Sequence, residues 1–238
     1  MASKDTPPPV PLNLETEAHS VDVQINTVII FGGPGSWKRE AYWDEYVLSM
    51  TNHGDHPVAL TSAMLIDFQG NQVMSGDDPW ALQEQSKEFI KGYDSGMNDV
   101  VLKVGAASLL TGAVIGGTAA ASLAAAFPTA SIGAGAVAAG AALATIVVLP
   151  IISLVAVVDN VQSKNKIQDE FNRRRLAPPL TIQPCQMIQG SLFFRISPGP
   201  KRLTLIFSEP EPGFDASVEL APLSDLHIER KSEEKPPQ

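Results

Sequence analysis

Alternating apolar and polar positions predict β-strands in both outer parts of the chain. Val21, Val23 and Ile25 alternate with Asp22, Gln24 and Asn26, which is the pattern of a half-buried strand. The predicted strands cover residues 21–31, 43–52, 58–68, 180–182, 187–196, 202–208 and 218–220. Because each side of the chain supplies only three or four strands, we expect the two groups to pair with each other in one β-sandwich.

Two stretches between these strand regions have helical periodicity instead. Asp78 is suited to cap a helix whose first residue is Pro79, and an apolar stripe then continues to Tyr93. A second amphipathic helix is predicted over residues 161–176 and ends before Pro178-Pro179. The chain is therefore expected to be mainly β with an α-helical insertion.

A run of 55 residues, 104–158, contains no charged side chain. Phe127-Pro128-Thr129 interrupts it, because proline removes a backbone donor and disfavours continued helix. At about 1.5 Å per residue, helices over 104–127 and 130–158 would span about 36 Å and about 43 Å, enough for a bilayer core of about 30 Å. The pattern predicts a transmembrane helical hairpin.

Small residues dominate this predicted hairpin, which has 18 alanines and 7 glycines. Such a composition inserts weakly into a bilayer, so helix packing must contribute. Gly112 and Gly116 on one helix, and Ala136 and Gly140 on the other, have the four-residue spacing that allows close approach of helix backbones. These positions could pack within one hairpin or between copies in a homo-oligomer, of which a pore is a special case.

The patterns divide the chain into five segments. We expect a flexible proline-rich tether over 1–20, the first half of the sandwich over 21–78, the helical insertion with its apolar hairpin (104–158) over 79–177, the second half of the sandwich over 178–226, and a disordered tail over 227–238.

Net charge and cysteine content narrow the range of functions. The formal charge of -9 and the pI near 4.9 argue against nucleic acid as a partner, because phosphate binding needs clustered Lys and Arg. A single cysteine, Cys185, excludes an intrachain disulfide and a multi-cysteine metal site.

Signals for catalysis and for cofactors are weak. Gly32-Gly33-Pro34-Gly35 follows a strand, but no Gly-Lys-Ser/Thr comes after it, so we interpret it as a turn. His53 and His56 lie in a turn without a third ligand, and Cys185 has no recognisable partner motif. We expect no catalytic residue, no metal site, no cofactor and no enzymatic activity.

Several segments resemble immunoglobulin-like domains of unknown function that are common in bacterial envelope lipoproteins. The similar segments are Tyr46–Val58, Ile66–Asn71, Ile182–Pro184, Gly190–Phe194 and Leu203–Phe207. Trp43–Tyr46 and Asp77–Leu82 are also similar to uncharacterised proteobacterial lipoprotein-like sequences. Cys185 stands where these domains usually have glycine. The resemblance implies an immunoglobulin-like sandwich that acts outside the cytoplasm as a binding or scaffold module.

Orientation signals conflict. Lysines and arginines flank the charge-free run on both sides, which favours cytoplasmic flanks in the inner membrane, whereas the resemblance implies flanks outside the cytoplasm. Location on the periplasmic face of the outer membrane reconciles the two. We therefore expect a non-enzymatic, membrane-anchored envelope scaffold that binds a protein partner. The alternative is an oligomeric, membrane-active or channel-like assembly of hairpins.

Overall fold

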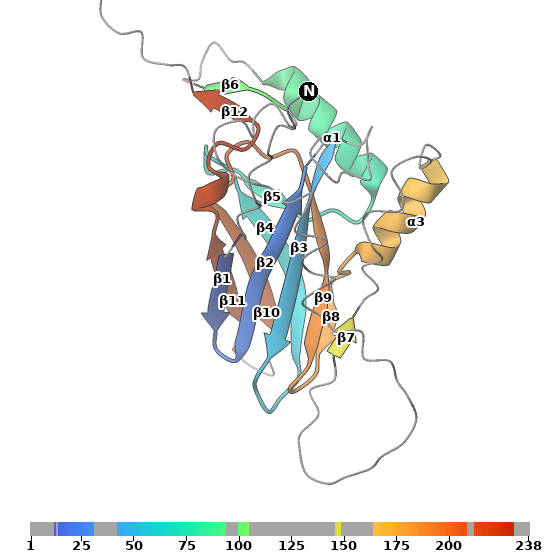
Figure 1. Ribbon diagram of the computed structural model, residues 1–238, viewed down its shortest axis with the longest axis vertical. Helices are drawn as coiled ribbons and strands as arrows, with labels where there is room; N and C mark the ends of the chain where they lie inside the picture. The colour runs from blue at the N-terminus through green and yellow to red at the C-terminus, as the bar shows by residue number, and fades with distance from the viewer. Residues whose placement is uncertain are drawn as a thin grey trace, which may run out of the picture.

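The computed structural model describes residue 12 and residues 14–30, 42–93, 100–104, 146–148, 164–208 and 212–230. In these residues the chain forms mainly antiparallel β-structure with two α-helices (Figure 1). The strands are β1 (Leu14–Ala18), β2 (Val21–Ile29), β3 (Trp43–Asn52), β4 (Val58–Ile66), β5 (Gln72–Met74), β6 (Val100–Leu102), β7 (Ile146–Val148), β8 (Leu180–Ile182), β9 (Met187–Arg195), β10 (Arg202–Ser208), β11 (Phe214–Glu219) and β12 (Ile228–Arg230). The helices are α1 (Pro79–Gly92), α3 (Lys164–Arg174) and a 3-10 turn at Ala221–Leu223.

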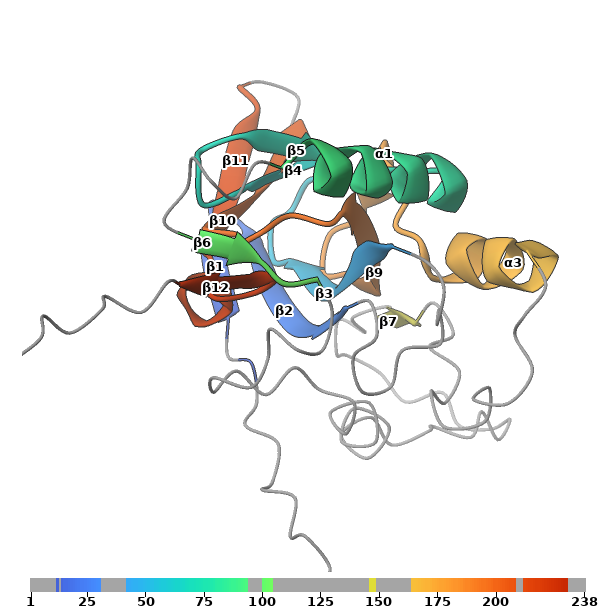
Figure 2. The same cartoon turned by 90° about the horizontal axis from the view of Figure 1, so that it is seen from above.

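Two sheets form the body of the protein. Sheet A has the order β1-β2-β3-β9-β7, and sheet B has the order β11-β10-β4-β5, with β8 also paired to β4. Figure 2 shows the two sheets as layers when the molecule is seen from above. Apolar side chains from both layers fill the space between them, including Val23 and Leu48 from sheet A and Leu65 and Leu205 from sheet B.

The pairing of distant parts of the chain is confirmed. β3 pairs with β9 along nine residue positions, so that Met50 lies opposite Ile188. In sheet B, β4 pairs with β10, and Leu65 lies opposite Leu203. Each sheet thus contains strands from before and after the insertion, which confirms a mainly β fold with an α-helical insertion. Its immunoglobulin-like character stays a prediction.

The two α-helices cover one end of the outer face of sheet A. Leu82 of α1 and two residues of α3, Ile167 and Phe171, pack against Trp43 and Phe193 of the sheet. The Phe171 ring stacks on the Phe193 ring with a centroid distance of 4.1 Å. Because Trp43 is fully buried in this cluster, it belongs to a second small core outside the sandwich.

The start of α1 follows the local sequence signals. The Asp78 side chain accepts a hydrogen bond of 2.8 Å from the backbone N–H of Trp80, and Pro79 is the first helical residue. Asp78 therefore satisfies one of the free amides at the helix start, as the sequence predicts.

Three short strands lie where the sequence predicts other structure. β1 falls within the segment 1–20 that we expected to be a flexible tether, and Leu14 reaches the core. β6 lies within the helical insertion, and β12 begins in the tail 227–238; these two strands pair with each other. β6 and β12 have three residues each, which is too few for a recognisable local periodicity, and pairing with a partner distant in the sequence stabilises them.

The prediction of a helix is wrong for one part of the hairpin. Ile146–Val148, inside the helix expected over 130–158, forms β7, which runs parallel to β9. Three consecutive β-branched residues favour this extended conformation. The proposed packing positions Gly112, Gly116, Ala136 and Gly140 lie outside the described residues. Neither α1 nor α3, the α-helices among the described residues, combines the length and apolar character needed to span a bilayer.

Candidate functional site

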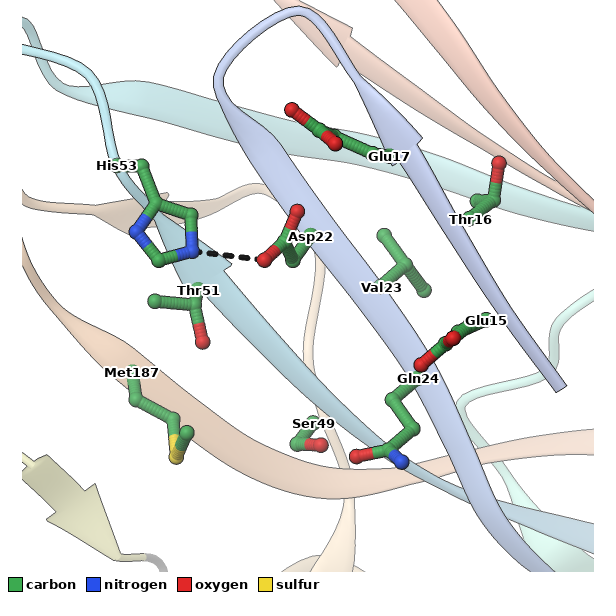
Figure 3. Close-up of a pocket in the computed structure, with 10 residues that line it drawn as sticks. All are labelled: Glu15, Thr16, Glu17, Asp22, Val23, Gln24, Ser49, Thr51, His53 and Met187. Carbon is green, nitrogen blue, oxygen red and sulfur yellow. Dashed lines mark hydrogen bonds and ion pairs between the residues drawn. The ribbon is translucent and has the colours of Figure 1, made fainter. Parts of the chain in front are cut away.

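The end of the outer face of sheet A that α1 and α3 leave uncovered is hollowed by a groove of about 620 Å³. Its side chains come from β1, β2, β3 and β9 and from the turn after β3 (Figure 3). The lining residues are Glu15, Thr16, Glu17, Asp22, Val23, Gln24, Ser49, Thr51, His53 and Met187. We refer to this feature as the sheet A groove.

Strand register arranges the floor of the sheet A groove in two rows. The first row crosses the sheet as Glu17, Asp22, Thr51 and Met187. The second row crosses it as Glu15, Gln24, Ser49 and Gln189. Side chains two residues apart on one strand face share a side and lie about 6.6–6.8 Å apart, which sets the spacing between the rows. Both rows are polar except for Met187.

Negative charge is concentrated at the β1–β2 end of the groove. Glu17 and Asp22 lie directly opposite each other in the ladder, an arrangement of like charges that destabilises a strand pair. His53 Nε2 lies 2.8 Å from an Asp22 carboxylate oxygen, and both side chains are more than half exposed. Within the described part of the chain, Glu15 and Glu17 form no ion pair.

The two histidines of the β3–β4 turn do not converge. His53 contacts Asp22, whereas His56 Nε2 lies 3.5 Å from Asp55. Among the described residues, no group of three or more His, Cys, Asp or Glu side chains has the geometry to hold a metal ion. The carboxylates of the groove are thus spread along a surface and do not form a cage.

A second polar feature consists of two adjacent buried acids on β3, Asp44 and Glu45. The Asp44 carboxylate lies 2.7 Å from His227 Nε2, and both side chains are almost completely buried. Tyr46 lies on the same strand face as Asp44 and is also buried. Burial raises the pKa of the Tyr46 phenol well above its ordinary value, and the nearby Asp44 charge raises it further. Asp44 therefore faces the space between the sheets.

Glu45 points to the opposite side of the sheet, toward α3. Ser191 Oγ donates a hydrogen bond of 2.7 Å to Glu45, and Arg174 Nη1 lies 3.4 Å from the same carboxylate oxygen. Arg174 also pairs with Glu170, which is in turn bound by Arg173. Burial acts to raise the pKa of Glu170, but the hydrogen bonds and charges of the two arginines outweigh it and hold that pKa below its ordinary value.

Asp44 and Glu45 thereby hold the segments on both sides of the charge-free run. Before the run, the backbone N–H of Lys103 donates a 2.8 Å hydrogen bond to the carbonyl oxygen of His227, the partner of Asp44. After the run, Arg174 at the end of α3 contacts Glu45. Neighbouring residues on one central strand thus fix both attachments.

Cys185 is exposed and has a φ of +56°. This is the left-handed region that glycine adopts most readily, and the resemblance places glycine there. The turn forms with cysteine nevertheless, because the Gln186 side chain accepts a 2.6 Å hydrogen bond from the backbone N–H of Gln183. Cys185 acts as a turn residue in this structure.

Sequence reasoning missed both polar features. The sheet A groove depends on β1, whose alternation of Glu15 and Glu17 with Leu14, Thr16 and Ala18 was the available signal. The pair of acids at 44 and 45, set among aromatic and apolar strand residues, was an equally visible sign of buried partners.

Comparison with models of known protein families, with curated proteins and with solved structures found no match. The fold and site define the class of this protein: a mainly β protein with an acidic groove on one sheet and a charge-free segment whose flanks are fixed to the same sheet.

Proposed function

We propose that this protein is a non-enzymatic scaffold that is attached to a membrane by its charge-free run and binds a protein partner with its β-domain. One observation carries the proposal. Adjacent residues Asp44 and Glu45 hold the flanks of the run, through His227 on one side and Arg174 on the other. Buried charged groups are costly unless paired, so two such attachments on one strand indicate that holding the run in place matters.

The attachment implies an even number of membrane crossings. If both flanks belong to one folded domain, they lie on the same side of a bilayer, which two helices satisfy. Residues 130–145 alone would make about 24 Å of helix, less than the bilayer core of about 30 Å. The inserted form therefore requires Ile146–Val148 to leave β9, which breaks a ladder of only three residue pairs.

We propose the bacterial cell envelope as the location, with the periplasmic face of the outer membrane favoured over the inner membrane. This part rests on the resemblance to envelope lipoprotein domains. Fractionation of cells that express the protein from its natural gene tests it: we expect recovery with the outer membrane. Recovery in the inner membrane with cytoplasmic flanks would rule this location out.

Vesicle flotation tests the membrane attachment. The full chain is mixed with uncharged phosphatidylcholine vesicles and centrifuged through a density gradient. Two variants are treated in parallel: Ile115→Asp changes the charge-free run, and Met74→Asp changes an exposed residue of β5 as the control. An aspartate at the centre of a membrane helix costs about 2.5–3.5 kcal/mol, so we expect the Ile115 variant to float several times less than wild type and the Met74 variant to float equally. Wild-type protein that stays at the bottom, or two variants that float alike, would refute the attachment.

An oligomeric, channel-like assembly is the second candidate. The spacing of Gly112 with Gly116 and of Ala136 with Gly140 favours it, because such spacings allow helices from different copies to pack closely. Mass measurement of the detergent-solubilised protein separates the two candidates. A monomer supports the scaffold, and a ring of defined stoichiometry supports the channel-like assembly.

A further inference from the structure

We infer that the sheet A groove binds an extended segment of a partner protein that carries Lys or Arg on alternate residues. This inference deepens the proposed binding-module function and rests on it. It names the chemistry of the partner and the surface that receives it.

Unbalanced charge within the groove points to a basic partner. Glu17 and Asp22 are opposite neighbours in the β1–β2 ladder, and Glu15 follows on the same face. Only His53 among the lining residues can carry positive charge, and it contacts Asp22 at the edge of the groove. Proteins tolerate such local conflicts mainly at functional sites, where a ligand supplies the missing charge.

The groove also has the dimensions of an extended chain. Glu15 and Glu17 are two residues apart on one strand face, which corresponds to about 6.6–6.8 Å. Alternate side chains of an extended peptide have the same spacing, so basic residues at positions i and i+2 meet the two glutamates together. The intervening residue faces away from the sheet.

The remainder of the floor suits a peptide backbone. Ser49, Thr51 and Gln24 present hydroxyl and amide groups beside the acidic end. Gln189 continues the second row but is 6 % exposed and does not line the groove, so the polar floor ends at Ser49. Met187 offers an apolar contact at the opposite end of the first row from Glu17 (Figure 3).

Competing occupants fit less well. A metal ion needs converging ligands, and no such group of three occurs among the described residues. Polyanions are repelled by the groove and by a chain with a formal charge of -9, whereas the same field accelerates encounter with a basic segment.

Fluorescence anisotropy with labelled peptides tests the inference on the full chain in an uncharged detergent. The probe is Thr-Lys-Thr-Lys-Thr, with Lys-Lys-Thr-Thr-Thr as the spacing control and Thr-Glu-Thr-Glu-Thr as the charge control. We expect saturable binding of the probe, about fivefold weaker binding of the spacing control, and no binding of the acidic peptide.

Two charge-matched double variants assign the binding to the groove. Glu15→Gln with Glu17→Gln removes two groove charges, and Asp215→Asn with Glu88→Gln removes two charges from exposed positions elsewhere. The groove variant should bind the probe about fivefold to tenfold more weakly, and the control variant should lose less than about twofold. Circular dichroism and urea unfolding confirm that both variants fold.

Several outcomes would overturn the inference. These are no saturable binding of the probe, equal weakening in the two double variants, and equal binding of both lysine peptides. Ca²⁺ or Mg²⁺ that competes with the probe at micromolar concentrations would instead indicate a cation site, and sedimentation of a dimer disrupted by Glu15→Gln with Glu17→Gln would indicate a second copy. Because the titration needs no bilayer, its result is independent of vesicle flotation: failure of flotation alone removes the membrane attachment and leaves the groove assignment intact.

Discussion

Asp44 and His227 are 183 residues apart in the sequence, yet their side chains meet at 2.7 Å in an almost fully buried hydrogen bond. The contact joins central strand β3 to the segment that leads into β12. It also fixes the carbonyl of His227 that binds Lys103, the residue just before the charge-free run. This hydrogen bond therefore connects the core of the sandwich to the start of the run.

Removing the Asp44 carboxylate should destabilise the fold. Asp44→Ala removes the buried carboxylate that contacts His227, and we expect the free energy of unfolding in urea to fall by about 1–3 kcal/mol. Asp44→Asn keeps an oxygen in a similar position, so its free energy of unfolding should fall less. Hydrogen exchange at Val100–Leu102 should accelerate in Asp44→Ala, whereas exposed Asp215→Ala should stay within about 0.5 kcal/mol of wild type. Equal losses in the Asp44 and Asp215 variants would contradict the role of the buried contact.

Replacing Arg174 should lower the free energy of unfolding more than replacing its partner Glu45. Arg174→Met removes the guanidinium that lies against the buried Glu45 carboxylate, and breaking a buried pair in this way costs about 3–5 kcal/mol. Glu45→Gln keeps a neutral acceptor in place, so we expect urea unfolding to show a smaller decrease in the free energy of unfolding. The exposed pair Arg202–Glu219 provides the control: Arg202→Met should cost less than about 1 kcal/mol. Equal losses in the Arg174 and Arg202 variants would show that burial of the pair has no energetic consequence.

The arginine cluster on α3 predicts acid sensitivity. The pKa of Glu170 is lowered in the folded state, so its contribution to stability is complete above the ordinary carboxyl pKa of about 4.3 and is lost as pH falls through the lowered value. We expect wild type to be more stable than Glu170→Gln at pH 7, and the difference to shrink as pH falls below the ordinary carboxyl pKa. Urea unfolding at a series of pH values measures it, and a difference that stays constant over this range would contradict the prediction.

Gly190 is required because the chain after α3 lies against β9. A Cβ built at Gly190 would lie 2.7 Å from Leu176 Cδ2 and 3.1 Å from the carbonyl oxygen of Arg174. Overpacking of this kind costs about 1–3 kcal/mol, so Gly190→Ala should lower the midpoint of thermal unfolding by several degrees. Gly92, at the end of α1, has no atom within 4 Å of such a Cβ. Gly92→Ala should be neutral or stabilising by up to about 1 kcal/mol, and a loss equal to that of Gly190→Ala would contradict the packing explanation.

Local signals were sufficient to predict several elements. Asp78 and Pro79 mark the start of α1 in the sequence because capping depends on residues within one turn. The long strands could also be predicted, since alternation over nine or ten residues is a strong signal. The number of strands on each side of the insertion was too small for two separate sandwiches, and this predicted that the two groups pair with each other.

Individual residues of the sites carried local signals, but their pairing could not be predicted because it depends on register and on distant partners. Glu17 faces Asp22 only when β1 pairs with β2 in one register, and β1 itself lies directly after a proline-rich segment. Glu45 and Arg174 are separated by 129 residues, and periodicity contains no information on such a pairing. The strand character of Ile146–Val148 likewise depends on β9 as its neighbour.

The opposite orientations of Asp44 and Glu45 make β3 intolerant of misalignment. A shift of one position along its neighbours would exchange the two faces of the strand, so that Asp44 would lose His227 and Glu45 would lose Arg174. The two buried acids thereby select one alignment of the central strand, because every alignment shifted by one residue would leave both acids apart from the partners that stabilise them.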